Sequence, residues 1–564
     1  MFVNPCFDYD YAHEHEHEQS GGQMHFRDNT STDTKDDVRR FLLIGLDGME
    51  PTLAEQWMTE GRLPNLARLR DRGTYLRLAS TIPPATLPAW TSCVTGVNPG
   101  RHGIFDFTEM VRGQYAIRFV NGRDRRSPAL WNILSALGKR VGVLGVPGAY
   151  PPEIVNGFMV SGFDSPVCTG IDRSFVYPPE LYPEVREWPF ADIQETDIRP
   201  GWHDRALPCL MRGIETKERI ACNLLCREPW DFFMVVFGES DTVAHHFWMF
   251  HDEQSPRHRT GHEDAIRRVY ERLDAAVGAL MDAADGMAVG VVSDHGFGGA
   301  GTGVAHLNNW LAEQGYLALA GSDRALMKKA ALSFVPDRWR GALFRRFPAM
   351  SAKAESRSRF AGIDWNRTRA WSEELNYFPS IRVNLQGREP AGQVPAEGYD
   401  AFLDELCARL ETWPVVKKAW RREAVYHGPH LDHAPDILLE LNLENGYSHS
   451  CLRARGGPSF RRLAPGEYLG GKERGMNGNH RPEGVFFLSI PANAGAAQIL
   501  DVAPTVLALM GVPRPDMDGV SLIEAEETIQ PIAPAGTDGV ASGAYSPEQA
   551  RQVEDRLRAL GYFE

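Results

Sequence analysis

Short apolar runs separated by helical patterns recur through the N-terminal half of this chain, and this alternation limits the folds open to it. Phe41–Leu46, Phe232–Phe237 and Ala288–Val292 are apolar without polar alternation, so each predicts a strand buried on both faces. Residues 264–284 place apolar side chains at helical spacing, at Ile266, Val269, Leu273 and Val277. Strands that alternate with helices predict an α/β fold with a mostly parallel sheet flanked by helices.

The alternation stops near residue 315 and returns before the C-terminus, which predicts an inserted α+β subdomain. We expect a disordered tail over 1–37, the first part of the core over 38–314, an insertion or cap over 315–430, the second part of the core over 431–528, and a linker with a C-terminal helix over 529–564. Residues 324–359 are basic and aromatic. A helical excursion with a solvated face is the preferred interpretation of this stretch, and a lid or membrane-surface contact is the alternative.

The composition excludes some classes of function. Lys and Arg number 60 against 74 Asp and Glu, a formal net charge of -14, which argues against binding of a nucleic acid polymer but not of a small nucleotide. The eight cysteines form no CxxC pair, so we expect reduced, mostly buried thiols. The sequence has no apolar run of about 20 residues and no secretory pattern, which predicts a cytoplasmic protein without a transmembrane segment. The HEHEHE stretch of the tail could bind metal adventitiously, but a solvated tail is preferred.

Polar side chains follow the predicted strands at the points where ligands bind in open α/β sheets. These residues are Asp47, Asp241, His245, Asp294 and His295, and His480 stands just before a further apolar run. Asp241 and His245 are four residues apart and would share one face of a helix. A single Asp–His pair is more often structural, but carboxylates and imidazoles from four segments are suited to Zn²⁺ or Mn²⁺. Six such ligands are enough for two metal ions with open positions.

Thr86 stands between a diproline and the start of a short predicted helix, with Pro88 in the first turn and Gly96 as its end. One interpretation is that Thr86 only caps this helix. The other is that it is a nucleophile, whose hydroxyl would need activation by a metal and by the positive end of the helix. Cys93 lies within the same helix and is assigned to the core.

Seven stretches resemble the alkaline phosphatase superfamily, in particular its type I phosphodiesterase/nucleotide pyrophosphatase branch and the predicted phosphohydrolases or phosphomutases within it. They are LLIGLDGMEP, PPATLPAWTSCVTGVNPGRHGIFDF, GESDTVAHHFW, VVSDHGF, IRVNLQGREPAGQV, GNHRPEGVFFLSIP and ILDVAPTVLALMGVPRPDMDG. They extend over residues 41–522, so the resemblance implies an alkaline-phosphatase-like sheet with helices on its faces and an inserted subdomain.

The resemblance implies a two-metal hydrolase. By position, Asp241, His245 and His480 would hold one ion, and Asp47, Asp294 and His295 would hold the other together with Thr86, the catalytic nucleophile. Family members usually carry two Zn²⁺, and Mn²⁺ is a realistic substitute. The implied activity is cleavage of a small phosphate ester or diester through a phospho-threonine intermediate, as in a phosphodiesterase or nucleotide pyrophosphatase. A phosphomonoesterase or phosphomutase, and a non-catalytic binding protein that keeps the fold, are the alternatives.

The chain departs from the nucleotide pyrophosphatase pattern at two positions. Ala89 replaces an Asn three residues after the nucleophile, and Phe107 replaces an Asn that helps to bind a phosphoryl oxygen. A phenyl ring has no hydrogen-bond donor, so no phosphate-binding role passes to Phe107. His102 and Arg481 are candidates for the substrate pocket, and Arg388 is a candidate substrate contact, with a structural role as the alternative for each. A sulfatase is disfavoured, because the Cys-or-Ser-x-Pro-x-Arg pattern is absent at the nucleophile. The substrate-binding residues and the oligomeric state are not predicted.

Overall fold

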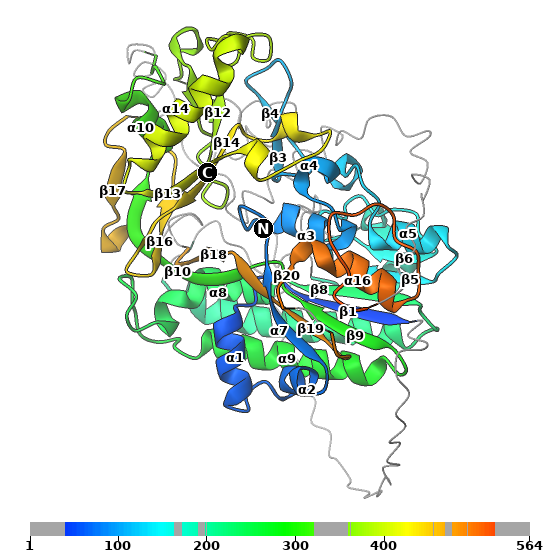
Figure 1. Ribbon diagram of the computed structural model, residues 1–564. Coiled ribbons are helices and arrows are strands. Elements are labelled where there is room, and N and C mark those ends of the chain that lie inside the picture. The colour runs from blue at the N-terminus through cyan, green and yellow to red at the C-terminus, as the bar shows by residue number, and fades with distance from the viewer. Residues whose placement is uncertain are drawn as a thin grey trace, which may run out of the picture.

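A computed structural model describes residues 40–162, 172–189, 198, 200–320, 359–360, 362–454, 456–468, 476–492 and 495–524. The predicted N-terminal tail, the C-terminal helix and nearly all of the basic stretch 324–359 lie outside the described residues. The chain forms a large α/β body, and a smaller group of strands and helices lies beside it (Figure 1).

A nine-stranded sheet forms the centre of the protein, in the order β20-β2-β19-β9-β1-β8-β5-β6-β7. Its strands are β1 (Phe41–Leu46), β2 (Thr74–Ala79), β5 (Val141–Leu144), β6 (Gly157–Val160), β7 (Val176–Tyr177), β8 (Phe232–Phe237), β9 (Ala288–Val292), β19 (Glu483–Leu488) and β20 (Ala497–Gln498). The central strands β9, β1, β8, β5 and β6 run parallel, whereas β19 pairs antiparallel with both β2 and β9, and β7 with β6. The predicted mostly parallel sheet is confirmed.

Helices cover both faces of this sheet. They are α1 (Pro51–Thr59), α2 (Pro64–Arg72), α3 (Thr86–Thr95), α4 (Pro99–His102), α5 (Leu130–Ala136), α6 (Tyr182–Val185), α7 (Trp202–Leu225), α8 (Glu239–His251), α9 (Ala265–Ala283) and α16 (Val502–Leu509). Figure 1 shows α7 and α9 on one face and α3 and α16 on the other. The sheet is thus packed between two apolar layers, which hold the ends of its strands in fixed positions.

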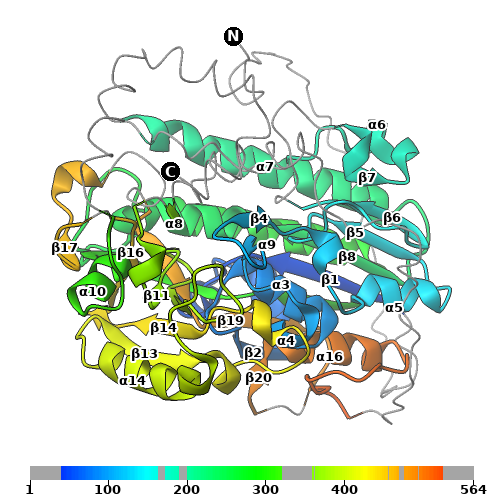
Figure 2. The same ribbon diagram turned by 90° about the horizontal axis from the view of Figure 1, so that it is seen from above.

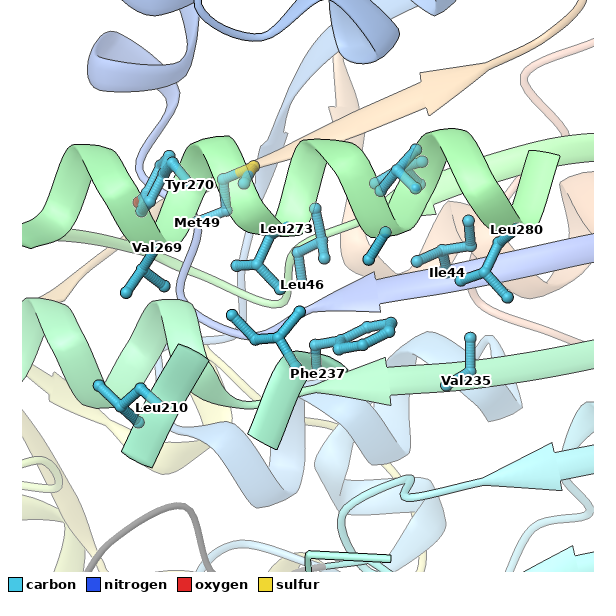
Figure 3. Packing of buried hydrophobic residues seen from close by; sticks show 14 of the residues in the cluster. Ile44, Leu46, Met49, Leu210, Val235, Phe237, Val269, Tyr270, Leu273 and Leu280 are labelled. Atoms are coloured by element: carbon cyan, nitrogen blue, oxygen red, sulfur yellow. The ribbon is translucent and has the colours of Figure 1, made fainter. Parts of the chain in front are cut away.

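Alternate side chains of β1 enter the two apolar layers because successive residues of a strand point to opposite faces. Leu42, Ile44 and Leu46 pack on the α7/α9 side, and Phe41 and Leu43 pack on the α3/α16 side. In Figure 3, side chains of α9 lie over those of β1 and β8; the labelled ones from α9 are Val269, Tyr270, Leu273 and Leu280. This is the face that the helical spacing predicted.

Two further sheets extend from the same side of the main sheet. One has the order β15-β16-β10-β17, with β18 also paired to β10; its strands are β10 (Gly296–Ala305), β15 (Leu443–Glu444), β16 (Tyr447–Cys451), β17 (Phe460–Arg462) and β18 (Gly478–Arg481). The other has the order β11-β12-β14-β13; its strands are β11 (Ala370–Trp371), β12 (Ser380–Val383), β13 (Val416–Arg421) and β14 (Ile437–Leu441). Helices α10 (Leu307–Glu313) and α14 (Tyr399–Glu411) lie with them (Figures 1 and 2), and a hairpin of β3 (Thr108–Met110) and β4 (Ile117–Phe119) is separate.

The second of these sheets corresponds to the predicted α+β subdomain. Strands β12 and β13 precede residue 430, where the predicted insertion ends, but β14, which pairs with both of them, follows it. The sheet therefore extends beyond the predicted boundary. The division into domains stays a prediction.

The thiols differ in part from the expectation. Among the described free cysteines, Cys93 and Cys451 are buried, whereas three are partly or fully exposed: Cys222, Cys226 and Cys407. Cys209 on α7 is disulfide-bonded, so the chain is not uniformly reduced. None of the helices in the described part of the chain is long and apolar enough to cross a bilayer. The cytoplasmic location stays a prediction.

Candidate active site

Six side chains from four segments meet at one edge of the main sheet. Asp47 directly follows β1, Asp241 and His245 lie on α8 after β8, Asp294 and His295 separate β9 from β10, and His480 lies on β18. Since β1, β8 and β9 are parallel neighbours, their carboxyl ends lie at the same edge. The six residues form two groups, within each of which the ligand atoms lie within 4.8 Å of one another.

The first group, here the α8 cluster, consists of Asp241, His245 and His480. The Nε2 atoms of the two histidines are 3.0 Å apart, and Asp241 Oδ1 is 3.4 Å from that of His245 and 3.2 Å from that of His480. Ligand atoms about 2.0–2.2 Å from a tetrahedral ion are about 3.3–3.6 Å from one another. The triangle of donor atoms in the α8 cluster therefore has nearly the size that a Zn²⁺-like ion requires.

The second group, here the sheet cluster, consists of Asp47, Asp294 and His295. His295 Nε2 lies 3.6 Å from Asp47 Oδ1 and 3.3 Å from Asp294 Oδ2. The two clusters are adjacent, because the rings of His295 and His480 stack with their centroids 3.7 Å apart. Two ions held by these clusters would be neighbours.

All three imidazoles are oriented by backbone carbonyls. The Nδ1 atoms of His245, His295 and His480 lie 3.0, 3.2 and 2.8 Å from the carbonyl oxygens of Gly478, Gly296 and Pro84. A carbonyl only accepts, so each Nδ1 carries a proton, and each Nε2 is turned toward its cluster, where its unprotonated form can bind an ion. This orientation is typical of metal-ligating histidines, whose second nitrogen is held by an outer partner.

One carboxylate oxygen of each aspartate is buried without a hydrogen-bond partner: Asp47 Oδ1, Asp241 Oδ1 and Asp294 Oδ2. These are the same oxygens that face the imidazole Nε2 atoms. The other oxygen of two of them is bonded, since Asp47 Oδ2 accepts from Trp90 Nε1 at 3.0 Å and Asp294 Oδ1 accepts from the backbone N–H of Gly48 at 3.2 Å. Because buried polar atoms are rarely left without a partner, the three oxygens fit cation ligands.

The pKa values of the carboxyl groups are shifted in opposite directions in the two clusters. Burial, together with the neighbouring carboxylates, raises the pKa of Asp47 well above its usual range, and burial also raises that of Asp294. Burial also acts to raise the pKa of Asp241, but the imidazoles of His245 and His480 outweigh it and lower the pKa well below its usual range. A bound cation favours the ionised form of a nearby carboxyl group.

Thr86 is the first residue of α3, and its side chain does not cap the helix. The capping position is Ala85, which has no side-chain oxygen, and Thr86 Oγ1 instead lies 3.2 Å from His295 Nε2. Thr86 is buried, at 4% exposure, so this hydroxyl is held at the sheet cluster and at the positive end of a ten-residue helix. The capping interpretation of Thr86 does not account for this position.

Sequence reasoning missed Trp90 and two close backbone approaches. Trp90 lies one helical turn after Thr86 and orients Asp47, and its only sequence signal is the four-residue spacing from Thr86. Gly48 has φ +67°, and a Cβ there would lie 2.6 Å from the ring of Phe297 and 3.0 Å from the Cα of Asp241. A Cβ at Gly478 would lie 2.1 Å from the carbonyl oxygen of Ala244, so glycine lets β18 approach α8.

Three other predicted candidates have structural surroundings. His102 is buried between Ser92 Oγ, 3.0 Å from its Nε2, and the backbone N–H of Ile104, and burial lowers its pKa to about 3. Arg388 donates through both terminal nitrogens to Asp436 at 2.7 Å. Cys93 is buried in the core, as assigned.

The two remaining positions lie in different surroundings. The ring of Phe107 packs edge-on against the ring of Tyr377. Arg481 lines a cavity beside His480. Of the proposed substrate contacts, Arg481 therefore keeps the position that a pocket residue requires.

The sequence matches the model of a known protein family. The model described as type I phosphodiesterase/nucleotide pyrophosphatase matches residues 41–450, most of the chain. The chain belongs to this family. It is therefore an enzyme that hydrolyses phosphoric ester bonds. The match includes Thr86 and five of the six cluster residues, whereas His480 lies beyond its end.

Solved structures share the fold at low sequence identity. Phosphonoacetate hydrolase from Sinorhizobium meliloti 1021 is 16% identical; its complex with phosphonoacetate has a TM-score of 0.51 and its complex with phosphonoformate 0.50, each over 84% of this chain and 95% of that one. Human ectonucleotide pyrophosphatase/phosphodiesterase 5 is 11% identical over 85% of this chain and 97% of that one, with a TM-score of 0.47. No curated protein matches the sequence at a significant level. The two phosphonoacetate hydrolase complexes agree with the alkaline-phosphatase-like fold.

Proposed function

We propose that this protein is a two-metal phosphodiesterase or nucleotide pyrophosphatase that cleaves small phosphate diesters with Thr86 as the nucleophile. One observation carries the proposal. Three buried carboxylate oxygens without partners and three imidazole lone pairs converge in two adjacent clusters, and the hydroxyl of Thr86 lies beside one of them. Family membership limits the reaction to phosphoric ester chemistry, and the clusters supply its ligands.

The residues fit two divalent cations. Asp241, His245 and His480 would hold one, and Asp47, Asp294, His295 and Thr86 would hold the other. Nitrogen and carboxylate donors in groups of three or four favour Zn²⁺, and Mn²⁺ also binds such sets. Bound divalent ions would neutralise charge on the phosphoryl group and favour the deprotonated form of the Thr86 hydroxyl.

The chain's own residues would act in two displacement steps. The Oγ of Thr86 attacks phosphorus, and the bond from phosphorus to the leaving oxygen breaks, which gives a phosphoryl-threonine. Water then attacks the same phosphorus, and the bond to Thr86 breaks to restore the hydroxyl. Helix α3 presents Thr86 with the positive end of its dipole, and Trp90 on the same helix keeps Asp47 oriented.

The test compares wild type with Thr86→Ala and Thr86→Ser after loading with Zn²⁺ or Mn²⁺. A phosphodiester and a phosphomonoester with the same chromogenic leaving group are assayed, and acid-quenched samples are examined by mass spectrometry for an adduct on Thr86. Faster diester cleavage, lost in Thr86→Ala and partly kept in Thr86→Ser, together with an adduct on residue 86, supports the proposal. Faster monoester cleavage would favour a phosphomonoesterase or phosphomutase instead. Full activity of Thr86→Ala would refute the role of Thr86.

A further inference from the structure

A cavity of about 380 Å³ adjoins the α8 cluster. His480 lines it on one side, and the segment 81–84, which leads into Thr86, lines another. Strands β13 and β14 of the small sheet contribute the opposite wall, through Trp420 and Leu439 among others. Ligand pockets are roughly 300–1,000 Å³, so the cavity is large enough for the organic part of a substrate.

Apolar side chains make up much of the cavity wall. They include Ile82, Tyr377, Trp420, Leu439, Leu441 and Leu443. Two of them are unusually exposed for large apolar residues, Ile82 at 41% and Leu443 at 49%. Exposed apolar surface gathered at one concave place marks a binding surface, whereas scattered exposed residues do not. The cavity therefore suits an apolar group.

The charged side chains in the cavity disfavour a cation. The single lining carboxylate, Glu440, pairs with Lys417 at 2.7 Å. Arg481 donates to the carbonyl oxygens of Gly299 and Gly446, and within the described parts of the chain no carboxylate lies within 4.0 Å of it. A positively charged substrate group would meet Arg481 and find no free carboxylate.

The position of the cavity relative to Thr86 decides which part of the substrate it would receive. The attacking oxygen of Thr86 lies at the sheet cluster, 3.2 Å from His295. In an in-line displacement the leaving oxygen departs on the side opposite to the attacking oxygen. The α8 cluster is the second cluster of the site, so the leaving oxygen would depart toward it. His480 belongs to the α8 cluster and also lines the cavity.

We infer that this cavity binds the leaving group, and that the preferred substrates are phosphate esters of apolar, uncharged alcohols or phenols. The inference rests on the proposed function, because it needs Thr86 as the nucleophile. Trp420 and Leu443 are specificity-determining residues in this arrangement. They touch the leaving group and take no part in bond breaking.

The test uses n-alkyl phosphates from butyl to octyl, prepared as monoesters and as methyl diesters. These alcohols have nearly equal acidity, so differences in kcat/KM report binding of the chain. A fully buried methylene contributes about fourfold in kcat/KM, the equivalent of about 0.8 kcal/mol. We expect kcat/KM of wild type to rise at least tenfold from butyl to octyl. A second pair compares the choline ester with its neutral isostere, the 3,3-dimethylbutyl ester, and the neutral ester should be cleaved faster.

Two variants and a control complete the design. Trp420→Ala and Leu443→Asp should flatten the dependence of kcat/KM on chain length. Ile154→Asp is the matched control, because Ile154 is 81% exposed and does not line the cavity. A flat series in wild type, a preference for the choline ester, or an unchanged slope in both variants would overturn the inference. Methyl-ester cleavage that survives Thr86→Ala would instead refute the proposed function, so the two failures are distinguishable.

Discussion

The α8 cluster and the sheet cluster each bring three ligands together, but with opposite balances of charge. The α8 cluster has two imidazoles and one carboxylate, and its imidazoles lower the pKa of Asp241. The sheet cluster has two carboxylates and one imidazole, and burial raises the pKa of both Asp47 and Asp294. The α8 cluster can compensate its own charge, whereas the sheet cluster needs a cation to keep both carboxylates ionised. Thr86, the proposed nucleophile, lies beside the more negative cluster.

The largest expected effect is on the attack of Thr86 on phosphorus, which takes place at the sheet cluster. Thr86→Ala removes the hydroxyl that lies 3.2 Å from His295 Nε2 and should lower kcat by about 10⁴-fold, as loss of a covalent nucleophile does. The number of metal ions bound per chain, measured by inductively coupled plasma mass spectrometry, should change much less, because Asp47, Asp294 and His295 remain. A loss of both ions along with activity would contradict the separation of nucleophile and ligands.

Substitution of one carboxylate in each cluster tests whether each holds its own ion. Asp241→Asn and Asp47→Asn should each reduce the bound metal from two ions per chain to about one and lower kcat/KM by about 10³-fold. Asp282→Asn is the control, since that side chain is 80% exposed on α9. If either variant lost both ions or neither, the two clusters would have to be treated as a single site.

Acid should weaken the helices that support the sheet cluster. Burial lowers the pKa of His102 to about 3, against about 6.5 in the unfolded chain, so below pH 6.5 only the unfolded chain gains a proton. Stability is therefore lost as the pH falls from 6.5 toward 3, by about 3 kcal/mol at pH 4. His102→Gln should be less stable than wild type at pH 7 but lose less between pH 7 and pH 4, measured by urea unfolding of the chelated protein. An equal loss in both proteins would exclude His102 as the source.

The smallest effect concerns the support of one ligand. Trp90→Phe removes the donor to Asp47 Oδ2 and should weaken binding of the sheet-cluster ion by about tenfold, because outer partners orient metal ligands. The ion of the α8 cluster should be unaffected, which calorimetric titration can resolve. Trp131→Phe is the matched control, because the buried Trp131 donates to Glu153 away from the clusters. Equal weakening in the two variants would mean that general packing, rather than this bond, is responsible.

Much of the sheet and the candidate site follows from local sequence pattern. Uninterrupted apolar runs fixed the ends of β1, β8 and β9, and the polar residues that follow them, Asp47 and Asp294 among them, have to lie at the shared edge. What could not be predicted depends on contacts between distant segments. The carbonyl of Pro84 that orients His480 and the partner of Arg388 have no local signal, because each contact depends on how separate elements pack.

One difference from the sequence interpretation is local. The interpretation of Thr86 as a helix cap is wrong, because the helix begins at Thr86 and Ala85 holds the capping position. Helix boundaries depend on competition between caps that differ by little in free energy, so an error of one residue is expected. Here a shift of one residue decides whether the hydroxyl of Thr86 caps the helix or faces His295.

The consecutive strands β18 and β19 are made late in synthesis, and this order has a chemical consequence. By the time residue 295 has left the ribosome, Asp47, Thr86, Asp294 and His295 all exist in the nascent chain, but β19, which separates β9 from β2, and His480 do not. At 5–20 residues per second, the remaining stretch to residue 480 takes roughly ten to forty seconds. During that interval the chain has its nucleophile and only one complete set of ligands. A single late segment then joins β2 to β9 and supplies the last ligand, so the second set of ligands is complete only after this segment has been made.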